Sequence, residues 1–452
     1  MQNTKFCALL LLSLIIVGIL TLSPTFSSLM NTVVINSTGE ISLFSITAKS
    51  GSPVDIQTAV NAVAAIGGGT VYVPAGNFTF NPPVNGTGVT IPYTTVPINI
   101  IGAGIGVTIL QETINSGGTP TTSFTSMFKR GYGGQTYSGG PVRISGISFV
   151  GFVVNETVTS NGAIQLVCTQ DFRIDHCSFQ DFDSQAISIS GNNGNNYPLI
   201  TRGVIDHNTF DNPYKAVLRP HNATGAYFSV WGYGIALSGI GHGQANSWDP
   251  NIQDYLGQYY NTSTYNGFPI PSPIYIENNN FTRTRHAISA NQEGYYVSRY
   301  NYFQESAPYG QNDVHGNAGN GIGGRGLESY SNIFNLTDES HSDGQDYAVE
   351  MRGGGGVVWN NTVIINPSYG THTVALMNDG ESAPYDVEQF YIWNNTAMWT
   401  NGTTFDFNSL ISNQAGYTQN INYFLRAPTQ TLDGFTYTPY TYPLPLTLTG
   451  TT

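Results

Sequence analysis

Short phrases in which apolar and polar residues alternate recur along the chain. An alternation with a period of two is typical of half-buried β-strands. The fourth position of each phrase is Asn, except in the first phrase, where it is Cys177. The more regular intervals are 22 to 34 residues, which suits one coil of a repeat protein and is too short for an independent domain. The phrases are IDHCSF (174–179), IDHNTF (205–210), IENNNF (276–281), SRYNYF (298–303), SYSNIF (329–334), VWNNTV (358–363) and IWNNTA (392–397).

The recurring asparagine indicates stacked coils. A short coil that turns sharply between strands needs a residue that tolerates left-handed backbone geometry, and Asn tolerates it. When coils stack about 4.8 Å apart, their Asn side chains can form a hydrogen-bonded ladder along the axis. No single coil can bury its own apolar face, so the pattern predicts an all-β solenoid, a single-stranded right-handed parallel β-helix.

A capping helix is predicted at about residues 53–66, before the coils. Ser52 is placed as the N-cap, with Pro53 at the first helical position and Asp55 three residues after the cap. Apolar residues share one face of this segment, and Gly67 to Gly69 end it. The helix should cover the open end of the first coil, because an exposed strand edge invites aggregation.

These features together resemble the pectin-lyase-like superfamily of right-handed parallel β-helices. The resemblance rests on DIQTAVNAVAAIGGGTVYVPAGNFTF (55–80), on INIIGAGIGVTIL (98–110) and on the Asn-ladder coils that follow, and it covers roughly residues 50–400. It implies a fold. It does not choose an activity, because that superfamily includes lyases, hydrolases, esterases, phage tailspikes and adhesins.

A second strand follows each phrase, and its third and fifth positions are predicted to face outward, because its second and fourth are mostly apolar. The alignment sets Asp313 beside Glu350 and His315 beside Arg352 on adjacent coils. The aligned strands are AISISG (186–191), AVLRPH (216–221), AISANQ (287–292), QNDVHG (311–316), AVEMRG (348–353) and TVALMN (373–378).

This group of four ionisable residues is the predicted catalytic site. Two carboxylates about 5 Å apart repel by roughly 3 kcal/mol at an effective dielectric constant of about 20, so one of Asp313 and Glu350 could hold a proton and act as an acid while the other acts as a base. His315 could move a proton, and Arg352 could pair with a sugar carboxylate. Two other readings remain: binding without chemistry, and a cross-strand ion-pair network that only stabilises the coils.

Four further residues are predicted to bind substrate. Arg299 and Arg325 belong to a group of arginines within residues 283–352 and could pair with an anionic sugar. Asn291 could supply neutral hydrogen bonds to hydroxyl groups. His286 is expected at a coil corner on the same side, either at the rim of the site or bonded to a backbone carbonyl.

Calcium is a possible cofactor, and no metal ligand is assigned. The phrases around Asp175 and Asp206 are similar to the Ile-Asp-His motif of pectate lyases, in which the aspartate contributes to a calcium site. The sequence departs from that motif, because the preceding tryptophan is absent and the lyase arginine base has no matching position. A solvated strand position is the alternative.

The chain is predicted to be one elongated domain with an export signal. Residues 1–28 have the layout of a signal peptide, 29–425 form the β-helix with an aromatic-rich insertion at about 221–273, and 426–452 form a tail rich in Thr, Pro and Tyr. The tail is expected either to lie along the solenoid or to link it to a cell surface or another subunit. Sequons such as Asn77 and Asn155 suit a secreted or cell-surface glycoprotein.

The charge excludes some partners. Only 10% of residues are charged and the net charge is −13, which speaks against nucleic acid and anionic membranes as partners. No membrane insertion of the mature chain is expected.

Cys168 and Cys177 could form a disulfide or lie buried as thiols. The sequence thus predicts a polysaccharide lyase or glycoside hydrolase, with a non-enzymatic adhesin, sheath or filament subunit that self-assembles through its tail as the alternative.

Overall fold

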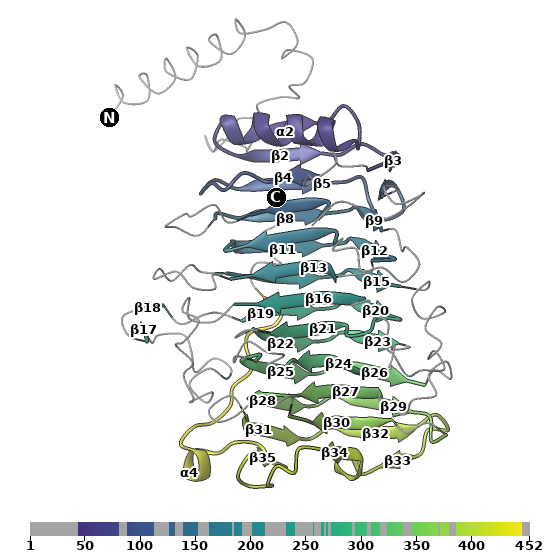
Figure 1. Cartoon of the computed structure of the whole chain (residues 1–452), viewed down its shortest axis with the longest axis vertical. Helices are drawn as coiled ribbons and strands as arrows, with labels where there is room; N and C mark the ends of the chain where they lie inside the picture. The colour runs from purple at the N-terminus through teal and green to yellow at the C-terminus, as the bar shows by residue number, and fades with distance from the viewer. Residues whose placement is uncertain are drawn as a thin grey trace, which may run out of the picture.

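The computed structural model describes three long parallel sheets that run the length of one elongated body (Figure 1). Most coils contribute one strand to each sheet. The fold is the right-handed parallel β-helix expected from the sequence. The described residues are 44–444 without 81–87, 113–125, 132–138, 152–161, 183–184, 192–200, 213–231, 240–255, 257–263, 266–267, 270–272, 292–293, 305–308, 317–322, 338–345, 369–370 and 379–385.

We name the three sheets A, B and C. Sheet A contains β1 (Ser45–Thr47), β2 (Gly69–Tyr72), β5 (Ile98–Ile101), β8 (Val142–Ser145), β11 (Gln170–Asp175), β14 (Arg202–Asp206), β19 (Ile274–Glu277), β22 (Tyr295–Arg299), β25 (Gly326–Tyr330), β28 (Gly354–Trp359), β31 (Val387–Trp393) and β35 (Tyr423–Phe424). Sheet B contains β3 (Gly76–Thr79), β6 (Thr108–Gln111), β9 (Ser148–Val150), β12 (Ser178–Gln180), β15 (Thr209–Asp211), β20 (Asn280–Thr282), β23 (Tyr302–Gln304), β26 (Ile333–Leu336), β29 (Thr362–Ile365), β32 (Thr396–Trp399) and β33 (Thr404–Phe405).

Sheet C carries the predicted site. It contains β4 (Val89–Thr90), β7 (Phe128–Arg130), β10 (Ile164–Val167), β13 (Gln185–Ser190), β16 (Tyr233–Ser238), β21 (Ile288–Asn291), β24 (Tyr309–Val314), β27 (Asp346–Met351), β30 (His372–Leu376) and β34 (Ile411–Asn413). Outside the three sheets lie a short hairpin of β17 (Thr264–Tyr265) and β18 (Phe268–Pro269), the helices α2 (Pro53–Ala65) and α4 (Gln430–Asp433), and the 3-10 helix η3 (Phe407–Leu410).

The predicted capping helix is confirmed as α2. The Ser52 hydroxyl accepts a hydrogen bond from the N–H of Asp55 at 3.2 Å, and Pro53 occupies the first turn. Ile56, Val60 and Val63 are fully buried. Figure 1 shows α2 across the end of the solenoid, where it covers the first coils. The helix therefore shields an apolar core that would otherwise be open at this end.

The asparagine ladder is also confirmed. The Oδ1 atom of Asn208 accepts from the N–H of Cys177 at 2.9 Å, and Asn279 repeats this contact with Asn208 at 3.0 Å. The same contact continues through Asn301, Asn332, Asn361 and Asn395.

The position of the left-handed residue was predicted wrongly. It is the third residue of each phrase, with φ between 51° and 57°, and not the ladder residue itself. The ladder Asn is selected for its side-chain bonds, while the third position makes the turn and points outward. The left-handed residues are His176, His207, Asn278, Tyr300, Ser331, Asn360 and Asn394.

One strand of sheet C was also assigned wrongly. The strand between β13 and β21 is β16, not residues 216–221, which lie outside the described part of the chain. The predicted insertion at about 221–273 therefore contains a coil strand, with Ala236 paired to Ser188 and Ser289. Both stretches alternate apolar and polar residues, so local pattern did not distinguish them.

Within the described residues, the tail lies along the solenoid, which is the first of its two predicted arrangements. We call residues 433–444 the C-terminal strap. Figure 1 shows this yellow segment leaving α4 and running back along the outside of the body. It crosses sheet A coil by coil: Asp433 bonds Tyr391, Tyr437 bonds Glu328, and the N–H of Leu444 reaches Glu277 at 3.1 Å.

Three further predictions concern the two cysteines, the signal peptide and membrane insertion. Both Cys168 and Cys177 are buried free thiols, so the disulfide alternative is not the one observed. The predicted signal peptide at 1–28 lies outside the described residues. Within the described residues, no helix is both long and apolar enough to span a membrane.

Candidate functional site

The strand register places the two predicted carboxylates side by side. Asp313 of β24 pairs with Glu350 of β27, and their neighbours in the same column are Ser289 of β21 and Ala375 of β30. The alternating residues Val314 and Met351 belong to the buried core, so the carboxylates project from the opposite, outer face of sheet C. The predicted adjacency of Asp313 and Glu350 is thus confirmed.

The Asp313 carboxylate is buried and its two oxygens have different partners. Oδ1 accepts from Nε and Nη2 of Arg352 at 3.1 and 2.8 Å, and Oδ2 accepts from the Ser289 hydroxyl at 2.6 Å. Burial alone would raise the pKa of Asp313, but Arg352, His286, His315 and the Ser289 hydroxyl outweigh it and lower the pKa to about 2. Asp313 is therefore an ionised carboxylate at neutral pH.

Glu350 fits against a glycine of the neighbouring strand. Its Oε2 atom accepts from the N–H of Gly310 at 2.8 Å. A Cβ atom at residue 310 would lie 2.3 Å from the Cβ of Glu350, so only glycine leaves room for this contact. Nε of Arg352 lies 3.4 Å from Oε1 of Glu350, so one guanidinium touches both carboxylates.

His286 is buried beside Glu350. Its Nδ1 is 2.7 Å from the carbonyl oxygen of Gly310 and 3.9 Å from Oε2 of Glu350. Burial lowers the pKa of His286 to about 3, so the ring is neutral at pH 7 and Nδ1 donates to the carbonyl. This is the backbone-bonded corner arrangement that was one of its two predicted roles, and it also touches the carboxylate pair.

A second outward column lies beside the carboxylates and is more exposed. Val314 and Met351 are strand partners, and His315 follows the first of them while Arg352 follows the second. Asn291 ends β21. His315 and Asn291 are partly exposed, and the Arg352 side chain is 11% exposed. Nδ1 of His315 lies 3.1 Å from the carbonyl oxygen of Gly316. The surface of the site is therefore basic and amide-rich, with the carboxylates beneath it.

Three donor atoms at this site lie close enough together that they could hold a metal ion. One atom each from His286, Asp313 and Glu350 lies within 4.8 Å of the others. The Arg352 guanidinium, however, already contacts both carboxylates. A cation therefore occupies the charge-balancing position, and a metal ion would have to displace it.

Arg299 does not belong to this site, contrary to prediction. It lies on sheet A, where it is fully buried and pairs with Glu277 at 2.7 Å. Its Nη1 and Nη2 atoms donate to the carbonyls of Tyr440 and Thr441 in the C-terminal strap, both at 2.9 Å. Arg299 therefore binds the C-terminal strap and not the candidate site. Arg325 is buried at the start of β25, next to sheet A, where its N–H donates to Gly294.

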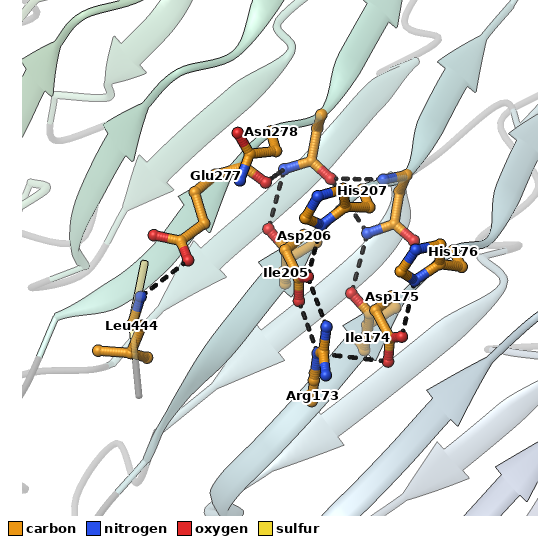
Figure 2. A network of polar contacts seen from close by, with 12 residues as sticks. Arg173, Ile174, Asp175, His176, Ile205, Asp206, His207, Glu277, Asn278 and Leu444 are labelled. Carbon is orange, nitrogen blue, oxygen red and sulfur yellow. Dashed lines mark hydrogen bonds and ion pairs between the residues drawn. The ribbon is translucent and has the colours of Figure 1, made fainter. Parts of the chain in front are cut away.

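Guanidinium groups occupy the oxygens that calcium would need on Asp175 and Asp206, and Figure 2 shows Arg173 in contact with both aspartates. Both oxygens of Asp175 accept from Arg143 at 2.8 Å, and both oxygens of Asp206 accept from Arg173 at 2.9 Å. Both aspartates are fully buried. They are ion-pair residues of sheet A, neither solvated positions nor calcium ligands, because guanidinium groups occupy their bidentate edges.

Sequence reasoning did not select Ser289 or Gly310. Ser289 was identified as an outward residue, and its place one coil before Asp313 was the signal that could have assigned it to the site. Gly310 precedes the aligned strand at 311–316, so its contact with Glu350 came only from the three-dimensional register.

No protein-family model matches the sequence, and comparison with curated proteins finds no similar sequence. Among solved structures, the chain is similar to rice weevil pectin methyl esterase, at 13% identity over 82% of this chain and 92% of that chain, with a TM-score of 0.40. It is similar to the PL6 family polysaccharide lyase Pedsa3628 from Pseudopedobacter saltans, at 12% identity over 88% and 90%, with a TM-score of 0.33.

The mannuronan C-5 epimerase AlgE6 A-module from Azotobacter vinelandii is also similar, at 13% identity and a TM-score of 0.31; the match covers 76% of this chain and 66% of that module. Likenesses of this size carry no argument about activity. The parallel pairing of the strands confirms the right-handed parallel β-helix that the sequence predicts.

Proposed function

We propose that the protein is a secreted or cell-surface carbohydrate-active enzyme that works on the outer face of sheet C. One observation carries the proposal: Arg352 contacts both members of a carboxylate pair on adjacent coils and still reaches the surface beside His315. Burial of ionisable groups costs free energy, and groups with shifted pKa values, such as Asp313 and His286 here, cluster at functional sites.

The exposures favour β-elimination over hydrolysis. Asp313 and Glu350 are at most 1% exposed, which leaves Arg352 and His315 as the groups that a polymer would meet first. Arg352 would pair with the carboxylate of an anionic sugar and stabilise the charge that develops on proton removal. His315 would take the proton next to that carboxylate, and the bond to the leaving sugar oxygen would then break.

In this scheme Asp313 and Ser289 are positioning residues. Asp313 remains ionised and fixes the guanidinium of Arg352, and Ser289 fixes Asp313. Glu350 contacts the same guanidinium and is a third positioning residue, and the proton that His315 takes is returned by His315 to the leaving sugar oxygen. Asn291 would donate or accept a hydrogen bond at a sugar hydroxyl, because it extends the same exposed column.

The test is cleavage of a polysaccharide panel by the purified full chain. The panel contains polygalacturonate, alginate and neutral glucans, and two signals are followed: ultraviolet absorbance from unsaturated ends, and new reducing ends. We expect an anionic polymer to yield both signals. Reducing ends without absorbance would indicate a hydrolase instead.

Variants then test the residues. His315→Gln and Arg352→Lys should each lower the rate about 100-fold or more, and Glu350→Gln should lower it as well. His372→Gln, a change on the next coil of sheet C, serves as the matched control and should keep the rate. Full activity in Glu350→Gln or His315→Gln would show that the residue assignment is wrong even if the protein is an enzyme.

A non-enzymatic structural or adhesive protein is the second candidate. The observation that favours it is that Asp313 and Glu350 are buried and ion-paired, as a purely stabilising network would be. It predicts no cleavage of any polymer in the panel. It also predicts self-association of the full chain, which sedimentation velocity would detect.

A further inference from the structure

Two histidines lie face to face at the turn between sheets A and B. The candidate site described above is on the third sheet, sheet C. His176 and His207 occupy the left-handed position of successive coils, with φ of 51° and 56°. Their rings are parallel, with centroids 5.1 Å apart, and the side chains are 57% and 47% exposed. Figure 2 shows the two rings side by side.

Each imidazole is oriented by the buried aspartate that precedes it. Nδ1 of His176 lies 2.9 Å from Oδ2 of Asp175, and Nδ1 of His207 lies 2.8 Å from Oδ2 of Asp206. An ionised carboxylate can only accept hydrogen bonds, so Nδ1 carries the proton in both rings. The neutral ring then keeps its lone pair on Nε2, on the side away from the aspartate.

The aspartates cannot turn away from the rings easily. Arg143 and Arg173 hold Asp175 and Asp206 by two hydrogen bonds each. Among the described residues, neither Nε2 atom has a hydrogen-bond partner or an ion pair. A histidine whose second nitrogen donates to a carboxylate is the arrangement that supports metal-bound imidazole in proteins.

We infer that His176 and His207 form a surface site for a divalent transition metal ion such as Zn²⁺, bound through both Nε2 atoms. Imidazole nitrogen favours zinc, copper and nickel over calcium or magnesium. Zinc–nitrogen bonds are about 2.0–2.1 Å long, so the two Nε2 atoms must come within about 4.2 Å of each other. The rings are parallel, so each must also rotate about its side-chain bonds before the two in-plane lone pairs point at one ion, and water would complete the coordination.

The test is Zn²⁺ titration of the full chain by isothermal titration calorimetry. We expect His176→Gln and His207→Gln each to weaken Zn²⁺ binding about tenfold or more, and the double variant to lose this site. His372→Gln on sheet C is the matched control and should bind Zn²⁺ as the wild type does. Because both target side chains are exposed, the variants should fold normally, which circular dichroism would verify.

A second measurement separates this site from the carboxylate cluster on sheet C. Zn²⁺ that ties two coils together should raise the melting temperature of the wild type, and this increase should vanish in the double variant. Nitrogen shifts of the histidine rings should change at Nε2 and not at Nδ1. Unchanged Zn²⁺ affinity and stoichiometry in the double variant would overturn the inference, as would no Zn²⁺ binding by the wild type.

Discussion

Arg352 donates two hydrogen bonds to one carboxylate oxygen of Asp313, which lies on the neighbouring coil. The same guanidinium approaches Glu350 to 3.4 Å. One cation therefore balances two buried anions, and the arrangement depends on the parallel register of β24 and β27. Loss of the cation would leave both carboxylates poorly compensated, whatever reaction the site performs.

Replacement of this cation should be costly. We expect Arg352→Met to lower the free energy of unfolding by about 3–5 kcal/mol, because it leaves Asp313 buried without its partner. The matched control is Arg202→Met. Arg202 pairs with Asp171, but these side chains are 42% and 26% exposed, so the loss should be about 0–1 kcal/mol. Denaturant unfolding measures both, and equal losses would contradict the account.

Stability should fall as the pH is lowered from about 6.5 toward 3, and His286 should be one cause. The pKa of His286 is lowered from 6.5 to about 3 in the folded protein. Between these values the unfolded chain binds a proton at this residue and the folded chain does not, so acid favours unfolding. The stability from the neutral ring is fully present above about pH 6.5. The folded pKa of Asp313 is about 2, so this residue lowers the stability of the protein only below pH 3.8, its ordinary pKa.

Melting temperatures measured between pH 4 and pH 7.5 would test this assignment. In His286→Gln the decline with acid should be shallower than in the wild type, because a neutral amide replaces the group that titrates only in the unfolded chain. A decline of the same slope in both proteins would show that another group is responsible.

The repeating parts of the fold were predictable because every coil repeats the same contacts. The ladder Asn residues and the alternation around Asp313 report directly on strand position, so the adjacency of Asp313 and Glu350 could be predicted from the sequence. β16 was missed because residues 216–221 alternate as well as residues 233–238 do, and pattern cannot tell which stretch pairs with β13.

Contacts between distant segments were not predictable in the same way. Arg299 lies on an outward position of sheet A, and its partners Tyr440 and Thr441 come from the strap about 140 residues later. Nothing local to Arg299 distinguishes a strap contact from a substrate contact. The burial of Asp313 has a different cause, since Ser289 and Arg352 on the two adjacent coils bond its two oxygens.

The strap should contribute to stability through its buried hydroxyl groups. Tyr437 donates to Oε2 of Glu328 at 2.7 Å, and Glu328 is fully buried. Tyr437→Phe should lower the free energy of unfolding by about 1–3 kcal/mol, because a buried carboxylate oxygen loses its donor. In Tyr442→Phe, the hydroxyl that is lost bonds Asn278 at the surface, so the change should be about 0.5 kcal/mol or less. Similar losses in the two variants would argue against a buried role for Tyr437.

Cys177 occupies the ladder position that Asn fills in the later coils, and it makes the same kind of contacts with a poorer donor. Its sulfur lies 3.3 Å from the carbonyl oxygen of Asp175 and 3.8 Å from that of Ile144. Asn279 donates to the equivalent carbonyls of Glu277 and Ile205 at 3.1 and 2.8 Å. An amide at residue 177 would therefore find two acceptors already in place.

We expect Cys177→Asn to stabilise the protein by about 1 kcal/mol, since each well-formed hydrogen bond contributes about 0.5–1.5 kcal/mol net. The amide oxygen would also accept from the N–H of Ile147 on the preceding coil, which extends the ladder by one step. Cys177→Ala is the matched control and should destabilise the protein, because it removes the side chain without replacing its contacts. Chemical denaturation under reducing conditions measures both variants. If Cys177→Asn were less stable than the wild type, the first coils would differ from the later ones in more than the ladder residue.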